Sequence, residues 1–82
     1  MNDTEILTGL TQVIEEVTGV PAVDVAMDKT FVDDLDIDSL SMVEILVAVE
    51  ERFGVNVPDE AARELRTVRD AVEYIKTTRV PA

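Results

Sequence analysis

The stretch DLDIDSLSMVEILVAVEERFG, residues 34–54, predicts a helix with more apolar residues than one buried face requires. Asp38 suits the N-cap position, because a carboxylate there accepts hydrogen bonds from the first free backbone N–H groups. Gly54 suits the C-terminal end, where a left-handed residue closes many helices. We therefore expect a helix from about residue 39 to residue 53. A surface helix normally has one apolar stripe, so the surplus apolar surface needs its own explanation.

On a helical wheel, the apolar residues of this helix form two stripes at spacings of three and four. The first, called the core stripe here, consists of Met42, Ile45, Leu46, Val49 and Phe53. The second stripe consists of Leu40, Val43 and Val47. The acidic residues around the second stripe are Glu44 and Glu51 on its face, and Asp38 and Glu50 beside it.

The second stripe has two interpretations. Either the helix is buried on two sides, or it presents a few apolar anchors, rimmed by charge, to a partner. The glutamates favour a docking surface, because a carboxylate buried without a partner is costly and few basic residues are present to pair with it. Such a surface suits a basic partner protein.

The composition excludes several classes of chemistry. The 82 residues predict one domain, residues 1–82, with a single small core. The chain has no cysteine and no histidine. A histidine general base, a Ser-His-Asp triad and a histidine-ligated metal site are therefore excluded, and stability must come from packing.

The net charge points to the kind of partner. Eighteen acidic and seven basic residues give a net charge of -11. Nucleic acid and anionic membranes are poor partners for such a surface, because both are bound through Lys and Arg. No apolar run reaches membrane-spanning length, and the N-terminus MNDTEILTGL lacks the basic start of a signal peptide. We expect a cytoplasmic monomer without membrane insertion, whose partners are basic protein surfaces.

The N-terminal half predicts one helix and a long connection. Residues 3–18 have the periodicity of an amphipathic helix, which Asn2 or Asp3 can cap and Gly19 can close. Residues 19–38 follow as a loop of unusual length. Apolar residues at intervals predict that this loop is pinned to the core: Val20, Val23, Val25, Met27, Phe31, Leu35 and Ile37.

The C-terminal part predicts a short helix and a final long one. The short helix runs from about 59 to 65, and the last begins near Thr67, which can form a capping box with Asp70. Residues 77–82 are expected to fray. The predicted fold class is all-α: a four-helix bundle of three longer helices and one short helix, with a long loop between the first and the second.

Ser39, at the head of the central helix, has a structural and a chemical interpretation. A serine hydroxyl often only supports a helix start. A self-activated nucleophile is not expected, because the chain has no histidine and no lysine nearby to act as a base. If Ser39 reacts, another enzyme must activate it, which indicates a modification site.

The aspartates before Ser39 resemble the start of a calcium loop. Asp34, Asp36 and Asp38 alternate as the first ligands of an EF-hand do. The pattern then fails, because Ser39 stands where glycine is expected and Ile45 where the bidentate glutamate is expected. We therefore assign no metal site here and leave open a weak, nonspecific binding of divalent cations.

Several motifs in a fixed order resemble the acyl carrier proteins. They are DSL at 38–40, VE at 43–44, EERF at 50–53, VPDE at 57–60 and TVRDAVEYI at 67–75, and the resemblance covers residues 6–75. It implies that Ser39 carries 4′-phosphopantetheine, which a phosphopantetheinyl transferase moves from coenzyme A with magnesium. The thiol of that arm then holds acyl chains as thioesters, and the chain is not an enzyme.

The resemblance also implies a docking face. Ketosynthase, acyltransferase, reductase and dehydratase enzymes with basic surfaces would contact it through Asp38, Leu40, Val43, Glu44, Val47, Glu50 and Glu51. The sequence departs from many bacterial fatty-acid carriers at Ser41, where these have an acid, and at Arg52, within the acidic patch. Family members can shelter the acyl chain between their helices, and a Val, Ile and Leu core suits this as well as ordinary packing.

Three functions remain open from the sequence. The context LDIDSLSMVEI is similar to actinobacterial carriers of type II fatty acid biosynthesis. A carrier of a polyketide or other secondary-metabolite pathway would share the same fold and chemistry. An acidic helical adaptor or calcium-dependent binding module, with Ser39 unmodified, is the alternative from another class.

Overall fold

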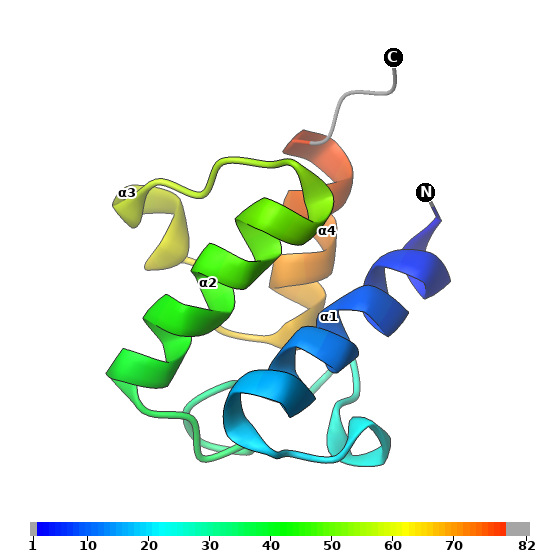
Figure 1. Cartoon of the computed structure of the whole chain (residues 1–82), viewed down its shortest axis with the longest axis vertical. Coiled ribbons are helices and arrows are strands. Elements are labelled where there is room, and N and C mark those ends of the chain that lie inside the picture. Colours follow the sequence, from blue (N-terminus) through cyan, green and yellow to red (C-terminus); the bar gives the residue numbers. More distant parts are fainter. Residues whose placement is uncertain (1, 79–82) are drawn as a thin grey trace.

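The described part of the chain, residues 2–78 of a computed structural model, is all-helical as predicted. It forms helices α1 (Asp3–Thr18), α2 (Ser39–Phe53), α3 (Asp59–Ala62) and α4 (Val68–Thr78), with a 3₁₀ turn, η1 (Ala22–Asp24), after α1. Helix α1 packs against both α2 and α4 (Figure 1). Three longer helices and one short helix, joined by a long first loop, confirm the predicted fold class.

The helix ends follow the local signals in the sequence. Asn2 caps α1 in a reciprocal box: the Glu5 N–H donates to Asn2 Oδ1 at 2.8 Å, and the Asn2 N–H donates to Glu5 Oε1 at 3.3 Å. Gly19 (φ 81°) and Gly54 (φ 66°) end α1 and α2 in the left-handed conformation that glycine adopts without strain. The predicted end residues of these two helices are therefore confirmed.

The core lies between α1, α2, α4 and the long loop. All four segments contribute fully buried side chains, and Phe31 of the loop is among the largest. The central buried residues are Ile6, Leu10, Val13 and Ile14 of α1, Ile45, Val49 and Phe53 of α2, and Val68, Ala71, Val72 and Ile75 of α4. The loop adds Val25, Phe31, Leu35 and Ile37.

The long loop is fastened to the start of α4 by backbone pairing. Thr30 and Thr67 form an isolated antiparallel bridge, and Thr67 forms the predicted capping box with Asp70, each backbone N–H bonding the other's side chain at 3.1 Å. Loop carbonyls also accept from first-turn N–H groups of α4, which have no partner inside the helix. The Val68 N–H donates to Lys29 O (2.9 Å) and the Arg69 N–H to Met27 O (2.9 Å). In the opposite direction, the Phe31 N–H of the loop donates to Arg66 O (3.0 Å).

Some predictions about these segments were wrong. Helix α3 ends at Ala62 instead of about residue 65, because the chain tightens into i→i+3 bonds that turn Leu65 into the core. Helix α4 continues to Thr78, so residues 77 and 78 do not fray, and residues 79–82 lie outside the described part. Val23 does not pin the loop, because it points outward from η1 with 90% of its surface exposed.

No helix in residues 2–78 is both long enough and apolar enough to cross a membrane.

Candidate functional site

Ser39 is the first residue of α2, and its side chain is exposed. The preceding Asp38 caps the helix by accepting a hydrogen bond from the Ser41 N–H at 2.8 Å. The hydrogen bonds from Ser41 hold the pKa of Asp38 below its usual range. The hydroxyl of Ser39 therefore stands in solvent at the positive end of a helix 15 residues long, a place that favours an attached anionic group such as a phosphodiester.

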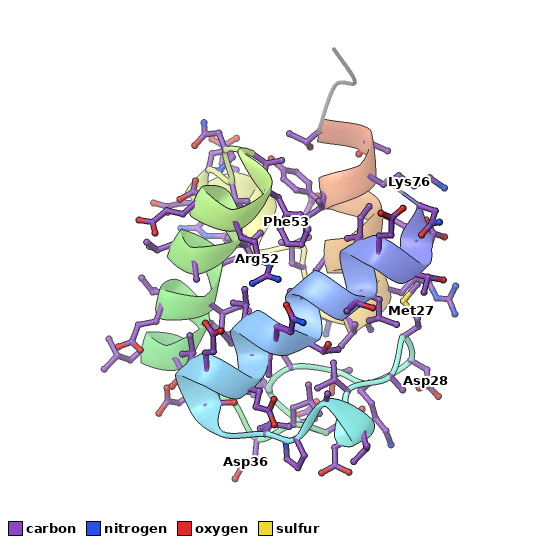
Figure 2. All side chains as sticks on the ribbon, turned by 45° about the vertical axis from the view of Figure 1, so that its right-hand side comes forward. Met27, Asp28, Asp36, Arg52, Phe53 and Lys76 are labelled. Carbon is purple, nitrogen blue, oxygen red and sulfur yellow. The ribbon has the colours of Figure 1, made fainter. Side chains whose placement is uncertain are left out.

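The segment before Ser39 is held by its own hydrogen bonds. Asp34 accepts from the N–H and hydroxyl of Thr30, at 2.8 and 3.1 Å, and these bonds lower its pKa. The Ile37 N–H donates to Phe31 O at 2.9 Å. Asp36, between them, is left-handed (φ 56°) and its side chain points outward from the base of the molecule (Figure 2). Ser39 is thus presented by a chain segment that is anchored two residues earlier.

The acidic residues before Ser39 do not converge on a common point. Within residues 2–78, no three Asp, Glu, His or Cys side chains are placed to hold a metal ion together. The carboxylates of Asp34 and Asp38 bond Thr30 and Ser41 instead. Local backbone hydrogen bonds thus occupy two of the three acids that suggested a calcium loop.

The second stripe of α2 is exposed. Leu40, Val43 and Val47 have 70%, 57% and 49% of their surface exposed. Glu44 and Glu51 are exposed as well. Of the two interpretations of the second stripe, the structure therefore excludes burial on two sides and retains an outward-facing apolar surface with acidic neighbours.

Glu50 and Arg52 have structural contacts that the sequence did not indicate. Glu50 is half-buried, and its carboxylate accepts from the Val57 N–H at 2.8 Å, which ties α2 to the chain before α3. The Arg52 guanidinium donates to the Gln12 side chain of α1. Arg52 therefore lies on the α1 side of α2 (Figure 2) and does not neutralise the face that carries the second stripe.

An open groove of about 670 Å³ runs between α2, α3 and residues 30–33, and Ser39 is one of its lining residues. Met42 and Leu46 of the core stripe are only half-buried because they line this groove, so only Ile45, Val49 and Phe53 of that stripe are fully buried. The other lining residues are Thr30, Phe31, Val32, Asp33, Val43, Val47, Glu50, Val57, Asp59, Ala62, Arg63, Leu65 and Arg66.

A small gap of about 10 Å³ lies beside the groove and shares Phe31, Met42, Leu46, Val57 and Leu65 with it. Its remaining lining residues belong to the core or pack on it: Leu10, Ile45, Val49, Ala71, Tyr74 and Ile75. The side chains that line both spaces therefore stand between the groove and the apolar centre of the bundle.

Sequence reasoning found the second stripe and Ser39 but missed the groove. Val32, Asp33, Arg63 and Arg66 belong to segments that meet only in the folded chain. No periodicity within one helix could have indicated them.

Comparison with known proteins gives consistent results. The family described as a phosphopantetheine attachment site matches residues 8–75. The chain is 58% identical to an acyl carrier protein of Acidothermus cellulolyticus over 95% of this chain and 93% of that protein. It is 60% identical to one of Rhodococcus erythropolis, over 88% and 79%. It is also 58% identical to a meromycolate extension acyl carrier protein of Mycolicibacterium aurum, over 88% and 74%.

Proposed function

The chain belongs to the acyl carrier protein family, which carries 4′-phosphopantetheine, and on that premise we propose that Ser39 is the residue that bears the group. The observation that carries this proposal is the position of Ser39. It is an exposed hydroxyl at the N-terminus of α2, inside the matched segment and on the wall of the groove. When bound, the arm supplies a thiol, on which acyl groups are held as thioesters.

The carrier itself is proposed to be non-catalytic. The Ser39 hydroxyl is exposed, and the chain has neither histidine nor cysteine, so no histidine of this chain can act as its general base. A phosphopantetheinyl transferase must therefore remove the hydroxyl proton and bring the arm from coenzyme A. Residues 1–82 act as one carrier domain in this proposal.

The proposed docking face is the exposed side of α2 around the second stripe. Its apolar anchors and the exposed carboxylates of Glu44 and Glu51 suit the basic surfaces of the transferase and of ketosynthase, acyltransferase, reductase and dehydratase partners. Its proposed residues are Asp38, Leu40, Val43, Glu44, Val47, Glu50 and Glu51. Glu50 has a different role within this set, because its carboxylate already bonds Val57 and positions the chain beside the groove.

The groove is proposed to shelter the acyl chain. Its volume of about 670 Å³ falls within the range of about 300–1,000 Å³ that is common for small-molecule sites. Met42, Leu46 and Leu65 give it apolar walls, and the small gap beside it provides a path inward if these side chains part.

The proposed pathway is type II fatty acid biosynthesis. A relative named for meromycolate extension supports a role in extending acyl chains. A polyketide carrier would have the same Ser39 chemistry, so the acyl group bound to the protein purified from its own cells distinguishes the two.

Intact-mass spectrometry tests the attachment directly. We expect coenzyme A, magnesium and a permissive phosphopantetheinyl transferase to add one phosphopantetheine to the wild-type chain. Ser39→Ala should remain unmodified, while Ser41→Ala, which removes the hydroxyl two residues further on, should still be loaded. An unchanged wild-type mass, with a transferase that loads a control carrier, would contradict the attachment at Ser39 and favour an acidic adaptor with Ser39 unmodified.

A further inference from the structure

Arg63 and Arg66 are two of only seven basic residues in a chain of net charge -11, and both line the groove that Ser39 lines. Both side chains are exposed. Within residues 2–78 an ion pair joins Lys76 to Asp3 at 3.1 Å, and neither Arg63 nor Arg66 forms an ion pair there. Their guanidinium groups are therefore available to a ligand in the groove.

The backbone of Arg66 is tied to the segment that presents Ser39, and the backbone of Arg63 is fixed at the end of α3. The Arg66 carbonyl accepts from the Phe31 N–H at 3.0 Å, and the Phe31 carbonyl accepts from the Ile37 N–H, two residues before Ser39, at 2.9 Å. The Arg63 N–H donates to the Asp59 carbonyl at 3.2 Å at the end of α3. The positions of the two backbones are therefore set by the fold, while the side chains remain free to turn.

The carboxylates around the groove would repel an anionic ligand unless basic groups lie nearby. Asp33 and Asp59 also line the groove, and Glu50 is engaged by the Val57 N–H. An anion brought into this groove would meet repulsion from the carboxylates and from the net charge of the chain. Two arginines among the lining residues offset that repulsion, and the planar donor pairs of their guanidinium groups match phosphate and carboxylate oxygens.

We propose that Arg63 and Arg66 bind anionic oxygens of the group carried on Ser39. The ligand chemistry is either the phosphodiester of the arm or the terminal carboxylate of a dicarboxylic acyl unit bound as its half-thioester. This inference rests on the proposed attachment at Ser39. In this proposal the two arginines bind the charged oxygens of the ligand, and the apolar lining residues of the groove contact a saturated acyl chain.

Nuclear magnetic resonance of the arginine side chains tests this proposal in three forms of the protein. The apo, phosphopantetheine-loaded and malonyl-loaded chains are compared through the Nε–Hε signals of Arg63, Arg66 and Arg69. Arg69 is the matched control, because it is exposed and of the same charge but does not line the groove. The phosphorus resonance of the loaded chain is recorded for wild type and for Arg63→Gln, Arg66→Gln and Arg69→Gln.

We expect the Arg63 and Arg66 signals to shift on loading and to return toward their apo positions as salt is raised. A shift already present with the bare arm identifies the phosphodiester, and its phosphorus resonance should move in Arg63→Gln and Arg66→Gln only. A shift confined to the malonyl form identifies the carboxylate. Signals that stay unchanged in both forms, or that follow Arg69, overturn the proposal, while a confirmed mass increase leaves the attachment at Ser39 intact. If Ser39 is not loaded, both proposals fail.

Discussion

Helices α2 and α4 use their apolar residues in different ways. The apolar stripe of α4, Val68, Ala71, Val72 and Ile75, is entirely buried. In α2 the three buried residues are matched by the three exposed residues of the second stripe. Packing in the core therefore explains the apolar stripe of α4 but not the second stripe of α2. Because burying a Val or Leu side chain fully is worth about 1.5–3 kcal/mol, burial of the second stripe against the proposed partners would contribute to binding.

Truncating one residue on each side of α2 gives the largest expected difference in stability between its buried and its exposed side. Ile45 is 1% exposed and Leu40 is 70% exposed. We expect Ile45→Ala to lower the free energy of unfolding by about 2–5 kcal/mol, through lost burial and a cavity. Leu40→Ala should change it by less than about 0.5 kcal/mol, as is usual for surface sites. Urea denaturation measures both, and equal losses would show that the second stripe supports the fold.

A smaller effect is expected where the buried side of α2 meets α1. A Cβ at Gly9 would lie 2.7 Å from Cζ of Phe53 and 3.2 Å from Nε of Arg52. Overpacking costs about 1–3 kcal/mol, and alanine regains up to about 1 kcal/mol of helix propensity. Gly9→Ala should therefore lose about 1 kcal/mol of unfolding free energy.

A double-mutant cycle identifies the cause of that loss. Phe53→Leu shortens the opposing side chain, so Gly9→Ala should cost less in that background. A cost that is the same in both backgrounds would show that the Phe53 ring does not set the close approach.

These contacts show which parts of the molecule could be predicted. Local signals predicted the ends of α1 and α2 and the start of α4, because a cap such as Thr67 with Asp70 depends on residues three apart in the sequence. Periodicity likewise predicted the second stripe, and the glutamates around it favoured its exposure over burial on two sides. The side chains on one helix face are fixed by the helix itself.

The rest depends on contacts between distant segments. Residues 27–31 pair with residues 66–69 through backbone groups, and this pairing could not be predicted because every residue type except proline carries the same backbone groups. The hydrogen bond from Arg52 to Gln12 joins residues 40 positions apart. The groove is assembled from three segments, so the half-burial of Met42 and Leu46 could not be read from their stripe alone.

Helices α2 and α4 also differ in how their first N–H groups are bonded, and the pH dependence of stability tests this difference. At the start of α4, loop carbonyls and the uncharged Thr67 hydroxyl accept from the first N–H groups, whereas the Asp38 carboxylate caps α2. The pKa of Asp38 is lowered by its bonds from Ser41, so its stabilisation is present above the unfolded pKa of about 3.9 and is lost as pH falls through the folded pKa.

Asp38→Asn keeps a good cap but cannot titrate. The unfolding free energy of wild type should therefore fall relative to that of Asp38→Asn as pH drops below about 4, and the difference should be constant above about pH 5. Thermal or urea unfolding of both chains across this range measures it. A difference that does not change down to pH 3 would mean that the charge of Asp38 contributes nothing to the cap.

The most direct test of the proposed role of α2 measures loading and stability together. Glu44→Lys and Glu51→Lys reverse exposed charges beside the second stripe, and Glu73→Lys makes the same change on an exposed site of α4. We expect kcat/KM for the phosphopantetheinyl transferase to fall several-fold in the two α2 variants and to stay at the wild-type value in Glu73→Lys, with all three chains about as stable as wild type. Wild-type loading in both α2 variants, or an equal loss in all three, would contradict a docking face on α2.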